Sequence, residues 1–330
     1  MRISIVLANY NHGAYLAQNL DGVRAQTHAD WEMIVVDDAS QDNSRTIIER
    51  YAAHEPRIKL IFHQKNRGTN AAMRTGWEHI TGSLVCGSAA DDFISNPRFF
   101  EMAVEAMRTH PSAAGFAARA TVIDAETGEE LWVMGHYPAP GFLSAEEAAK
   151  AFWGASLFIP GASALWKREL VQGVGGYHDE LGPQSDYFVN HALAALGGVV
   201  LAEEPVVAVR ASSSSFSAAV TDADYFRRHA LAEKKMRALD VPYRIAPEWI
   251  KPWRERIIAH RSFAGLQERF TKWVRGYIES IQPWERRALP PGFLAYLARL
   301  SEDIAPFEAD IRAQRAAAWE IFDKVAGKLD

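Results

Sequence analysis

The chain has 330 residues, an ordinary globular composition and a formal net charge of −5, so it is long enough for one large α/β domain with an appendage. A mildly acidic chain is a poor match for nucleic acid, which we exclude as the main partner. The single cysteine, Cys86, lies in an apolar run, which excludes a disulfide framework and a cysteine-ligated metal. The amino terminus lacks a signal-peptide pattern, and no apolar run reaches the ~20 residues of a spanning helix. We expect a cytoplasmic protein.

Strand and helix patterns alternate through the first 110 residues. The spacing predicts strands at 3–8, 31–36, 58–62 and 83–86, and helices at 14–26, 44–53, 70–80 and 98–109. Asn96 and Pro97 are expected to cap and start the last of these helices. Such alternation predicts an α/β fold with a parallel sheet and right-handed crossovers.

Beyond residue 113 the pattern is less regular. We predict strands at 121–123, 162–166 and 206–210, helices at 144–152 and 186–195, turns at 124–128 and 175–176, and loops at 135–141 and 211–215. From Asp222 onward the pattern is helical, and basic residues exceed acidic ones between Tyr225 and Arg287. We therefore place a boundary there, giving a catalytic domain at 1–221 and a helical C-terminal region at 222–330.

Two acidic pairs, Asp37-Asp38 and Asp91-Asp92, each follow a predicted buried strand. Ligands of open α/β sheets bind outside the carboxyl ends of the strands, so both pairs should border one pocket. Carboxylates that converge repel one another unless a cation or several donors lie between them, and Mn²⁺ or Mg²⁺ suits such oxygen ligands together with substrate phosphates. One pair alone could equally be turn or capping chemistry. Two pairs at strand ends favour a binding site.

An ordered series of short motifs over roughly the first 215 residues resembles the inverting family 2 glycosyltransferases, which have a GT-A fold. The series comprises Ala8-Asn9-Tyr10-Asn11, Gln26-Thr27, residues 31–42, Asn66-Arg67-Gly68, Gly76, Ala89-Ala90-Asp91-Asp92, Pro97, Gly175-Gly176-Tyr177 and Ser185-Asp186. The resemblance implies a mixed, mainly parallel sheet flanked by helices. It also implies metal-dependent, inverting transfer of a sugar from a nucleoside diphosphate donor, a UDP-sugar by preference, to a hydroxyl acceptor during synthesis of surface polysaccharide or glycolipid.

The resemblance also implies a role for each matching residue. In the nucleotide-binding set, Tyr10 would stack on the base and Asp38 would accept the base imide hydrogen, with Asp37 supporting Asp38. Asp91 would lie toward the ribose. The set also includes Ala8 and Arg74. Asp92 would hold the metal that bridges the diphosphate. Asp186 would be the base that deprotonates the acceptor hydroxyl. The alternatives are that Tyr10 packs on the next helix, that Asp37 caps it, and that Asp186 is a helix N-terminal acid.

Two positions depart from the family pattern. Ala89 stands where the commoner metal motif has its first acid, and Arg210 is followed by Ala211 where many relatives carry a histidine. The diphosphate would then depend on Arg210, Arg74 or the serine-rich loop, although each arginine could equally be a solvated surface group.

Residues 249–281 place Trp, Tyr and aliphatic side chains at helical spacing among arginines. This stripe would lie at the inner membrane surface near a lipid-linked acceptor, or would pack on the catalytic domain or a second subunit; we favour packing.

Two other functions stay open on the sequence. A nucleotidyltransferase should carry a basic, glycine-rich loop after the first strand, which residues 8–13 lack. A binding or scaffold protein could have kept the fold and lost catalysis, given Ala89 and the missing histidine.

Overall fold

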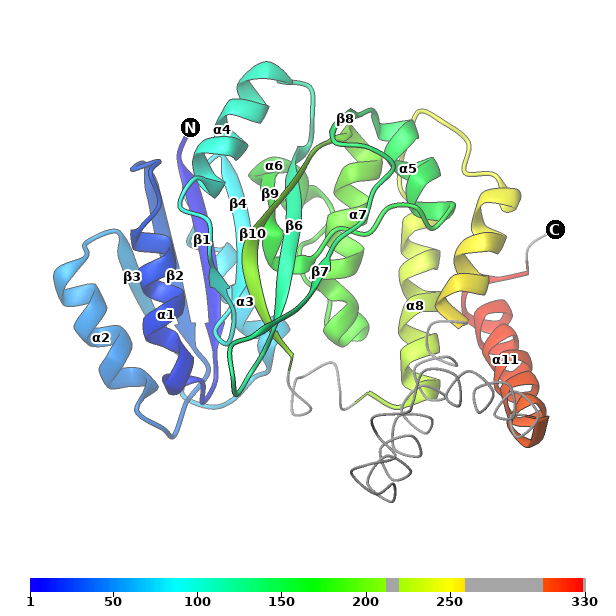
Figure 1. Cartoon of the computed structure of the whole chain (residues 1–330), viewed down its shortest axis with the longest axis horizontal. Coiled ribbons are helices and arrows are strands. Elements are labelled where there is room, and N and C mark those ends of the chain that lie inside the picture. The colour runs from blue at the N-terminus through cyan, green and yellow to red at the C-terminus, as the bar shows by residue number, and fades with distance from the viewer. Residues whose placement is uncertain (212–219, 259–304, 329–330) are drawn as a thin grey trace, which may run out of the picture.

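The computed structural model describes residues 1–211, 220–258 and 305–328. In these parts of the chain a ten-stranded sheet has the order β3-β2-β1-β4-β9-β6-β10-β5, with β7 beside β6 and β8 beside β10 (Figure 1). The strands are β1 (Ile3–Asn9), β2 (Trp31–Asp37), β3 (Ile58–Phe62), β4 (Leu84–Ala89), β5 (Phe93–Ile94), β6 (Gly115–Asp124), β7 (Glu130–Met134), β8 (Gly141–Leu143), β9 (Ala164–Lys167) and β10 (Val199–Ala211).

Helices cover both faces of this sheet (Figure 1). They are α1 (Gly13–Arg24), α2 (Ser44–His54), α3 (Thr69–Trp77), α4 (Phe99–Thr109), α5 (Ala145–Trp153), α6 (Arg168–Gly173), α7 (Ser185–Gly197), α8 (Asp222–Arg237) and α11 (Ala305–Ala326), with 3-10 turns η1 (Gly161–Ser163) and η2 (Asp179–Gln184). β1 to β4 run parallel, as do β6 and β10, whereas β9 runs antiparallel to β4 and β6. The predicted mixed, mainly parallel α/β fold is confirmed.

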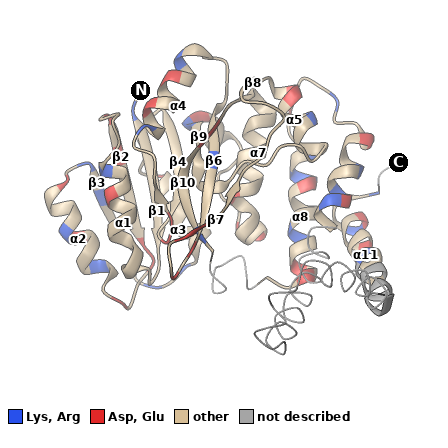
Figure 2. Ribbon diagram, in the orientation of Figure 1, with Lys and Arg blue, Asp and Glu red and all other residues tan. Residues whose placement is uncertain are grey.

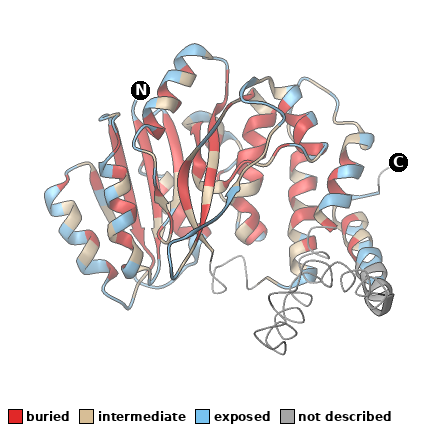
Figure 3. Ribbon diagram, in the orientation of Figure 1, coloured by how far each residue is buried: buried red, intermediate tan, exposed pale blue. Residues whose placement is uncertain are grey.

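Alternate residues of the central strands belong to two apolar clusters, one on each face of the sheet. Ile5 packs with Leu16 of α1 and Phe100 of α4, whereas its neighbour Val6 packs with residues of α3, α5 and α7 such as Phe152. The central strands and α7 are accordingly buried along most of their length (Figure 3). Burial on both faces explains why these strands read as continuous apolar runs rather than alternating ones.

The described C-terminal helices share the second of these clusters. Phe226 of α8, Trp253 of the helix at 247–258 and Phe322 of α11 are buried there with Phe152. Residues 249–258 of the predicted amphipathic stripe therefore pack on the α/β part of the chain, while residues 259–281 lie outside the described part of the chain. The boundary at 222 stays a prediction, because the structure joins both sides of it through one core.

Several elements differ from their predicted bounds. Strands β5, β7 and β8 were not predicted, and β10 begins at Val199 rather than 206 because Pro205, at a register shift, interrupts its strand pattern. Asn96 does not cap α4: the N-cap is Arg98, and Asn96 Oδ1 accepts the Arg98 amide at 2.9 Å in the preceding turn. Ser144 and Glu147 form a capping box at the start of α5. Most of the serine-rich loop, from 212, lies outside the described residues.

In the described ranges, no helix combines the length and the apolar character that crossing a bilayer requires.

Candidate active site

The parallel register brings the predicted site residues to one edge of the sheet. Asn9 pairs with Asp37, and Ala8 pairs with Ala89, so the chain segments after β1, β2 and β4 leave the sheet side by side. Tyr10, the first residue after β1, is 42% exposed. An exposed aromatic side chain at this edge is free to stack on a flat ligand, and that role for Tyr10 stays a prediction.

Asp37 holds the loop that follows β2. Its carboxylate accepts hydrogen bonds from Asn9 Nδ2 at 2.7 Å and from the Ser40 hydroxyl and amide at 2.6 and 3.0 Å. Ala39, between them, has a positive φ of 66° and needs this external support. Asp37 does not cap the next helix, whose N-cap is Asn43. It therefore positions Asp38.

Asp38 is buried and already has several donors from the protein. Its oxygens accept the amide hydrogens of Arg67 at 2.9 and 3.0 Å and of Gly68 at 2.7 Å, and Oδ1 lies 2.6 Å from His63 Nδ1. The other ring nitrogen of His63, Nε2, lies 3.0 Å from the Thr75 hydroxyl on α3. Asp38 thus fixes the 63–68 segment at the end of β2. Contact with a base imide stays a prediction, and that imide would share Asp38 with these donors.

Asp92 lies in a buried turn after β4. Its Oδ1 accepts the amide hydrogen of Arg210 at 2.9 Å, and burial, followed by the charge on Asp91, raises its pKa to about 7. The Arg210 guanidinium donates to the Asp91 carbonyl and to Gln18, and it lies 4.6 Å from the centre of the Tyr15 ring. The structure therefore places a cation directly beside the acidic pair.

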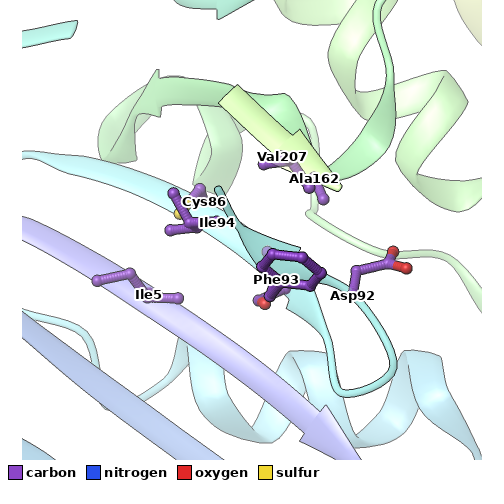
Figure 4. Close-up of a pocket in the computed structure, with 9 residues that line it drawn as sticks. Ile5, Cys86, Asp92, Phe93, Ile94, Ala162 and Val207 are labelled. Carbon is purple, nitrogen blue, oxygen red and sulfur yellow. The ribbon is translucent and has the colours of Figure 1, made fainter. Parts of the chain in front are cut away.

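Figure 4 shows a small cavity behind this turn. Its lining includes Ile5, Cys86, Phe93, Ala162 and Val207, with Asp92 at one end. The apolar lining explains the burial that raises the pKa of Asp92, because few groups behind it could solvate a charge. It also agrees with a structural role for Cys86, whose thiol pKa burial raises to about 12.

Arg74 is engaged elsewhere in this structure. Its guanidinium makes two bonds of 2.7 Å to Asp179 and a third of 3.2 Å to the Tyr177 carbonyl. These contacts tie α3 to the segment that leads into α7. A nucleotide-binding role for Arg74 stays a prediction, since it would require giving up the pair with Asp179.

Asp186 lies in the first turn of α7, facing Gly161. Its Oδ1 accepts the amide hydrogen of Tyr187 at 2.7 Å, and burial raises its pKa to about 6. The charge on Asp186 is also one of the causes that raise the pKa of Asp92, so the two carboxylates are within electrostatic reach. A raised pKa makes a carboxylate a stronger base near neutral pH.

The chemistry of these acids fits a cation that is shared with a ligand. Among the residues that the structure describes, no group of three or more His, Cys, Asp or Glu side chains could hold a metal alone. Asp92 beside Asp91 nevertheless suits Mg²⁺ or Mn²⁺, which is usually held by one or two carboxylates together with substrate phosphates. The residues present therefore fit a site that is completed by a diphosphate.

Comparison with known proteins identifies the family. Residues 4–172 match the family described as glycosyl transferase family 2, which is half of the chain. The chain belongs to glycosyl transferase family 2. This confirms the resemblance seen in the sequence motifs.

Two glycosyltransferases are similar in sequence to parts of this family 2 chain. It is 40% identical over 110 residues to the uncharacterized glycosyltransferase alr2836 of Nostoc sp., which covers 33% of this chain and 34% of that protein. It is 29% identical over 146 residues to TuaG of Bacillus subtilis, whose name provisionally assigns it to teichuronic acid biosynthesis. The match covers 44% of this chain and 54% of TuaG. The chain thus spans about a third to a half of the length of the curated relatives it matches.

Two solved structures share the fold. S. aureus TarS 1–349 in complex with UDP-GlcNAc has a TM-score of 0.65 at 15% identity, covering 99% of this chain and 90% of that chain. The mannosyltransferase PcManGT from Pyrobaculum calidifontis, in complex with GDP-Man and Mn²⁺, has a TM-score of 0.55 at 17% identity, covering 97% and 86%. At these identities the likeness confirms the GT-A type of fold for this glycosyltransferase family member and nothing finer.

Sequence reasoning missed some contributors to this family 2 site. His63 follows β3 at the same sheet edge and could have been noticed as a third polar residue after a strand. Gly161 gave no such signal. Its contact with Asp186 joins two segments that are distant in sequence, and only the folded structure brings them together.

Proposed function

We propose that this chain is a divalent-metal-dependent, inverting glycosyltransferase that uses a nucleoside diphosphate sugar, by preference a UDP-sugar. The acceptor would be a hydroxyl group of a glycan or of a lipid-linked sugar, in the synthesis of surface polysaccharide or glycolipid. The observation that carries the proposal is the pair Asp92 and Asp186, two carboxylates with raised pKa values within electrostatic reach of each other at the carboxyl edge of the sheet. UDP-GlcNAc bound to TarS and the naming of TuaG support the donor and the pathway.

Asp186 acts as the general base in this proposal. The acceptor oxygen attacks the anomeric carbon and its proton passes to the Asp186 carboxylate, while the bond from that carbon to the donor phosphate breaks and the nucleoside diphosphate leaves. Attack opposite the leaving group inverts the configuration. A base with a pKa of about 6 is mostly ionised at pH 7 and takes the proton more readily than an ordinary aspartate.

Asp92 would hold Mn²⁺ or Mg²⁺ at the diphosphate, and its neighbour Asp91 would lie toward the ribose. When bound, the ion would supply Lewis-acid neutralisation of the charge that develops on the departing diphosphate. Arg210, which already touches the Asp91 carbonyl, provides a second positive charge at the same place. This cation partly offsets the two departures from the family pattern, Ala89 and the missing histidine.

The cellular setting and the domain division belong to the same proposal. We place the protein in the cytoplasm, where it could meet a lipid-linked acceptor at the inner face of the membrane. Residues 1–221 would form the catalytic domain, and residues 222–330 would support it and mediate any membrane or subunit contact. Centrifugation with anionic liposomes at low and high salt tests the membrane contact, which should weaken as salt rises.

The decisive experiment measures release of nucleoside diphosphate from a panel of UDP-sugars, with Mn²⁺ or with EDTA. Asp186→Asn should reduce turnover by roughly 10²- to 10⁴-fold, the usual contribution of a general base, and should keep affinity for UDP. Glu49→Gln, on the exposed face of α2, is the control. If wild-type protein releases no nucleoside diphosphate from any donor, the scaffold alternative is favoured. If it instead forms pyrophosphate from UTP and a sugar phosphate, the nucleotidyltransferase alternative is favoured.

A further inference from the structure

We infer that the hydroxyl group of Tyr177 binds a hydroxyl group of the transferred sugar and so selects the donor. This inference rests on the proposed function and deepens it, because it assigns a sugar-contacting residue to the same site. Four observations carry it: the place of the hydroxyl group, its lack of a protein partner, its relation to Asp186 and the rigidity of its support.

The Tyr177 hydroxyl lies against β4, the strand that leads to Asp92. A methyl group on Gly87 of β4 would lie only 2.9 Å from the Tyr177 hydroxyl oxygen and 2.8 Å from Met73 Cε. Glycine at position 87 therefore leaves the space that this hydroxyl occupies. Because Gly87 and Asp92 belong to the same strand and its following turn, the hydroxyl lies near the side on which the diphosphate would bind.

This hydroxyl makes no hydrogen bond to another residue in the described part of the chain. Tyr177 as a whole is only partly buried. Other partly buried tyrosines of the fold do have partners, such as Tyr243, which donates to the Ala195 carbonyl at 2.5 Å. A phenol without a protein partner has its donor and acceptor capacity left for a polar group of a ligand.

Tyr177 also faces the proposed base. Burial, followed by the charge on Asp186, raises the pKa of Tyr177 well above its ordinary value. The phenol therefore stays protonated and cannot serve as a base itself. Inversion places the acceptor and the leaving group on opposite sides of the anomeric carbon, so the ring of the sugar must lie between Asp186 and Asp92. A hydroxyl that approaches Asp186 from β4 borders that space.

The side chain is held in place before any ligand binds. Gly175 and Gly176 both have positive φ, at 80° and 61°, and their amides donate to the carbonyls of α6 residues Gln172 and Val171. The Tyr177 carbonyl accepts from Arg74 at 3.2 Å, and its ring lies 6.1 Å from that of Trp77. Such support reduces the entropy lost when the hydroxyl binds a sugar.

The test compares Tyr177→Phe with wild-type protein and with Tyr51→Phe, a control whose hydroxyl bonds to Asp21 on the far helix pair α1 and α2. Calorimetry measures the affinity for UDP, and steady-state assays measure kcat and KM for the best UDP-sugar of the panel and for its singly deoxygenated analogues. Tyr177→Phe should change UDP affinity less than twofold and lower kcat/KM for the full donor by about 3- to 10-fold, the worth of one hydrogen bond. Gly87→Ala, which displaces the hydroxyl, should produce the same pattern.

One deoxy donor should be equally good for wild-type and Tyr177→Phe protein, because the contacted hydroxyl is absent from it. A merely structural tyrosine would instead weaken UDP and every donor alike, and that result would overturn the inference. If Tyr177→Phe matches wild type with all donors while wild type transfers sugar, the inference fails and the proposed function stands. If wild type uses no UDP-sugar, both fail.

Discussion

Gly161 lies directly against the carboxylate of Asp186: a methyl group on residue 161 would be 2.0 Å from Asp186 Oδ2. Gly161 begins η1, and the preceding residue Pro160 is tied to α7 by a bond of 3.3 Å from Asn190 Nδ2 to its carbonyl. The loop can therefore not move away freely. Glycine at position 161 is required for the space that the proposed base occupies.

Gly161→Ala should misplace the Asp186 carboxylate and lower kcat by roughly 10²-fold, the cost that a displacement of about 1 Å in a reacting group can carry. Affinity for UDP should stay at the wild-type value. Gly173→Ala is the matched control, because nothing lies within 4 Å of the added methyl. Wild-type turnover in Gly161→Ala would show that the position of Asp186 does not matter for the reaction.

The raised pKa of Asp186 predicts the pH dependence of activity. The acid limb of kcat/KM should have its midpoint near pH 6 rather than near 4, because a protonated Asp186 cannot accept a proton. The profile is measured with saturating Mn²⁺ at fixed ionic strength. The residual activity of Asp186→Asn should lack this limb; a limb that persists unchanged in that variant would belong to another group.

The same carboxylate predicts a gain in stability when it is removed. Its folded pKa of about 6 exceeds the ordinary value of 3.8, so the folded state binds the proton more tightly, and the associated stability is lost as the pH rises from about 4 to 6. Asp186→Asn should therefore raise the free energy of unfolding at pH 7 by about 1–3 kcal/mol. Urea unfolding at pH 7 and pH 4 checks this, since the gain should disappear at the lower pH.

The sequence was most informative where local periodicity and the fold agree. The strand at 58–62 was predicted with its observed bounds, and the acidic pairs do lie at the carboxyl ends of β2 and β4, although Asp37 is itself the last residue of β2. Strand β7 escaped prediction because Leu131 and Val133 are exposed on a strand whose partner, β6, was itself recognised only in part. Edge strands of this kind gain their structure from pairing and not from their own pattern.

The site shows the same division. Motifs next to strand ends identified Asp37, Asp38 and Asp92 as a group, but only the structure shows which of them already have protein donors. Arg74 and Arg210 were equivalent in the sequence. The fold pairs Arg74 with Asp179 and brings Arg210 to the acidic turn, and both arrangements depend on contacts between distant segments.

We expect the C-terminal helices to stabilise the fold, because a buried arginine of the helix at 247–258 forms ion pairs with both α8 and α11. Arg254 is fully buried, donates to Glu233 of α8 at 2.7 and 2.8 Å, and donates to Asp323 of α11 at 2.9 Å. Figure 2 shows that charged residues lie along both of these helices. Arg254→Met would remove both short bonds to the buried Glu233 carboxylate and leave it with the longer contact to Arg237, at 3.5 Å.

This variant should lose about 3–5 kcal/mol in the free energy of unfolding, measured by chemical denaturation. Adding Glu233→Gln should restore part of the loss, because the uncompensated charge is then gone. Arg227→Met, which breaks an exposed pair with Asp224, should cost under about 1 kcal/mol. Equal losses for Arg254→Met and Arg227→Met would contradict the integral packing of this region.

Glu32 of β2 should govern how the free energy of unfolding changes at acid pH, because its partners lie on β1, on β3 and just before β4. Burial alone would raise its pKa, but hydrogen bonds from Lys59 at 2.8 Å and from Thr81 and Ser4 at 2.7 Å outweigh burial and lower it to about 2. A depressed pKa contributes stability that is present above the unfolded value near 4.5 and is lost as the pH falls toward 2.

Glu32→Gln should therefore cost about 3 kcal/mol in the free energy of unfolding at pH 7, the equivalent of that shift, and progressively less below pH 4. Glu49→Gln, exposed on α2, provides the baseline for removing one acid from this half of the chain. Urea titrations of both variants from pH 7 to pH 3 give the comparison. A penalty that stays constant over this range would mean that Glu32 stabilises the sheet through the shape of its side chain and not through its charge.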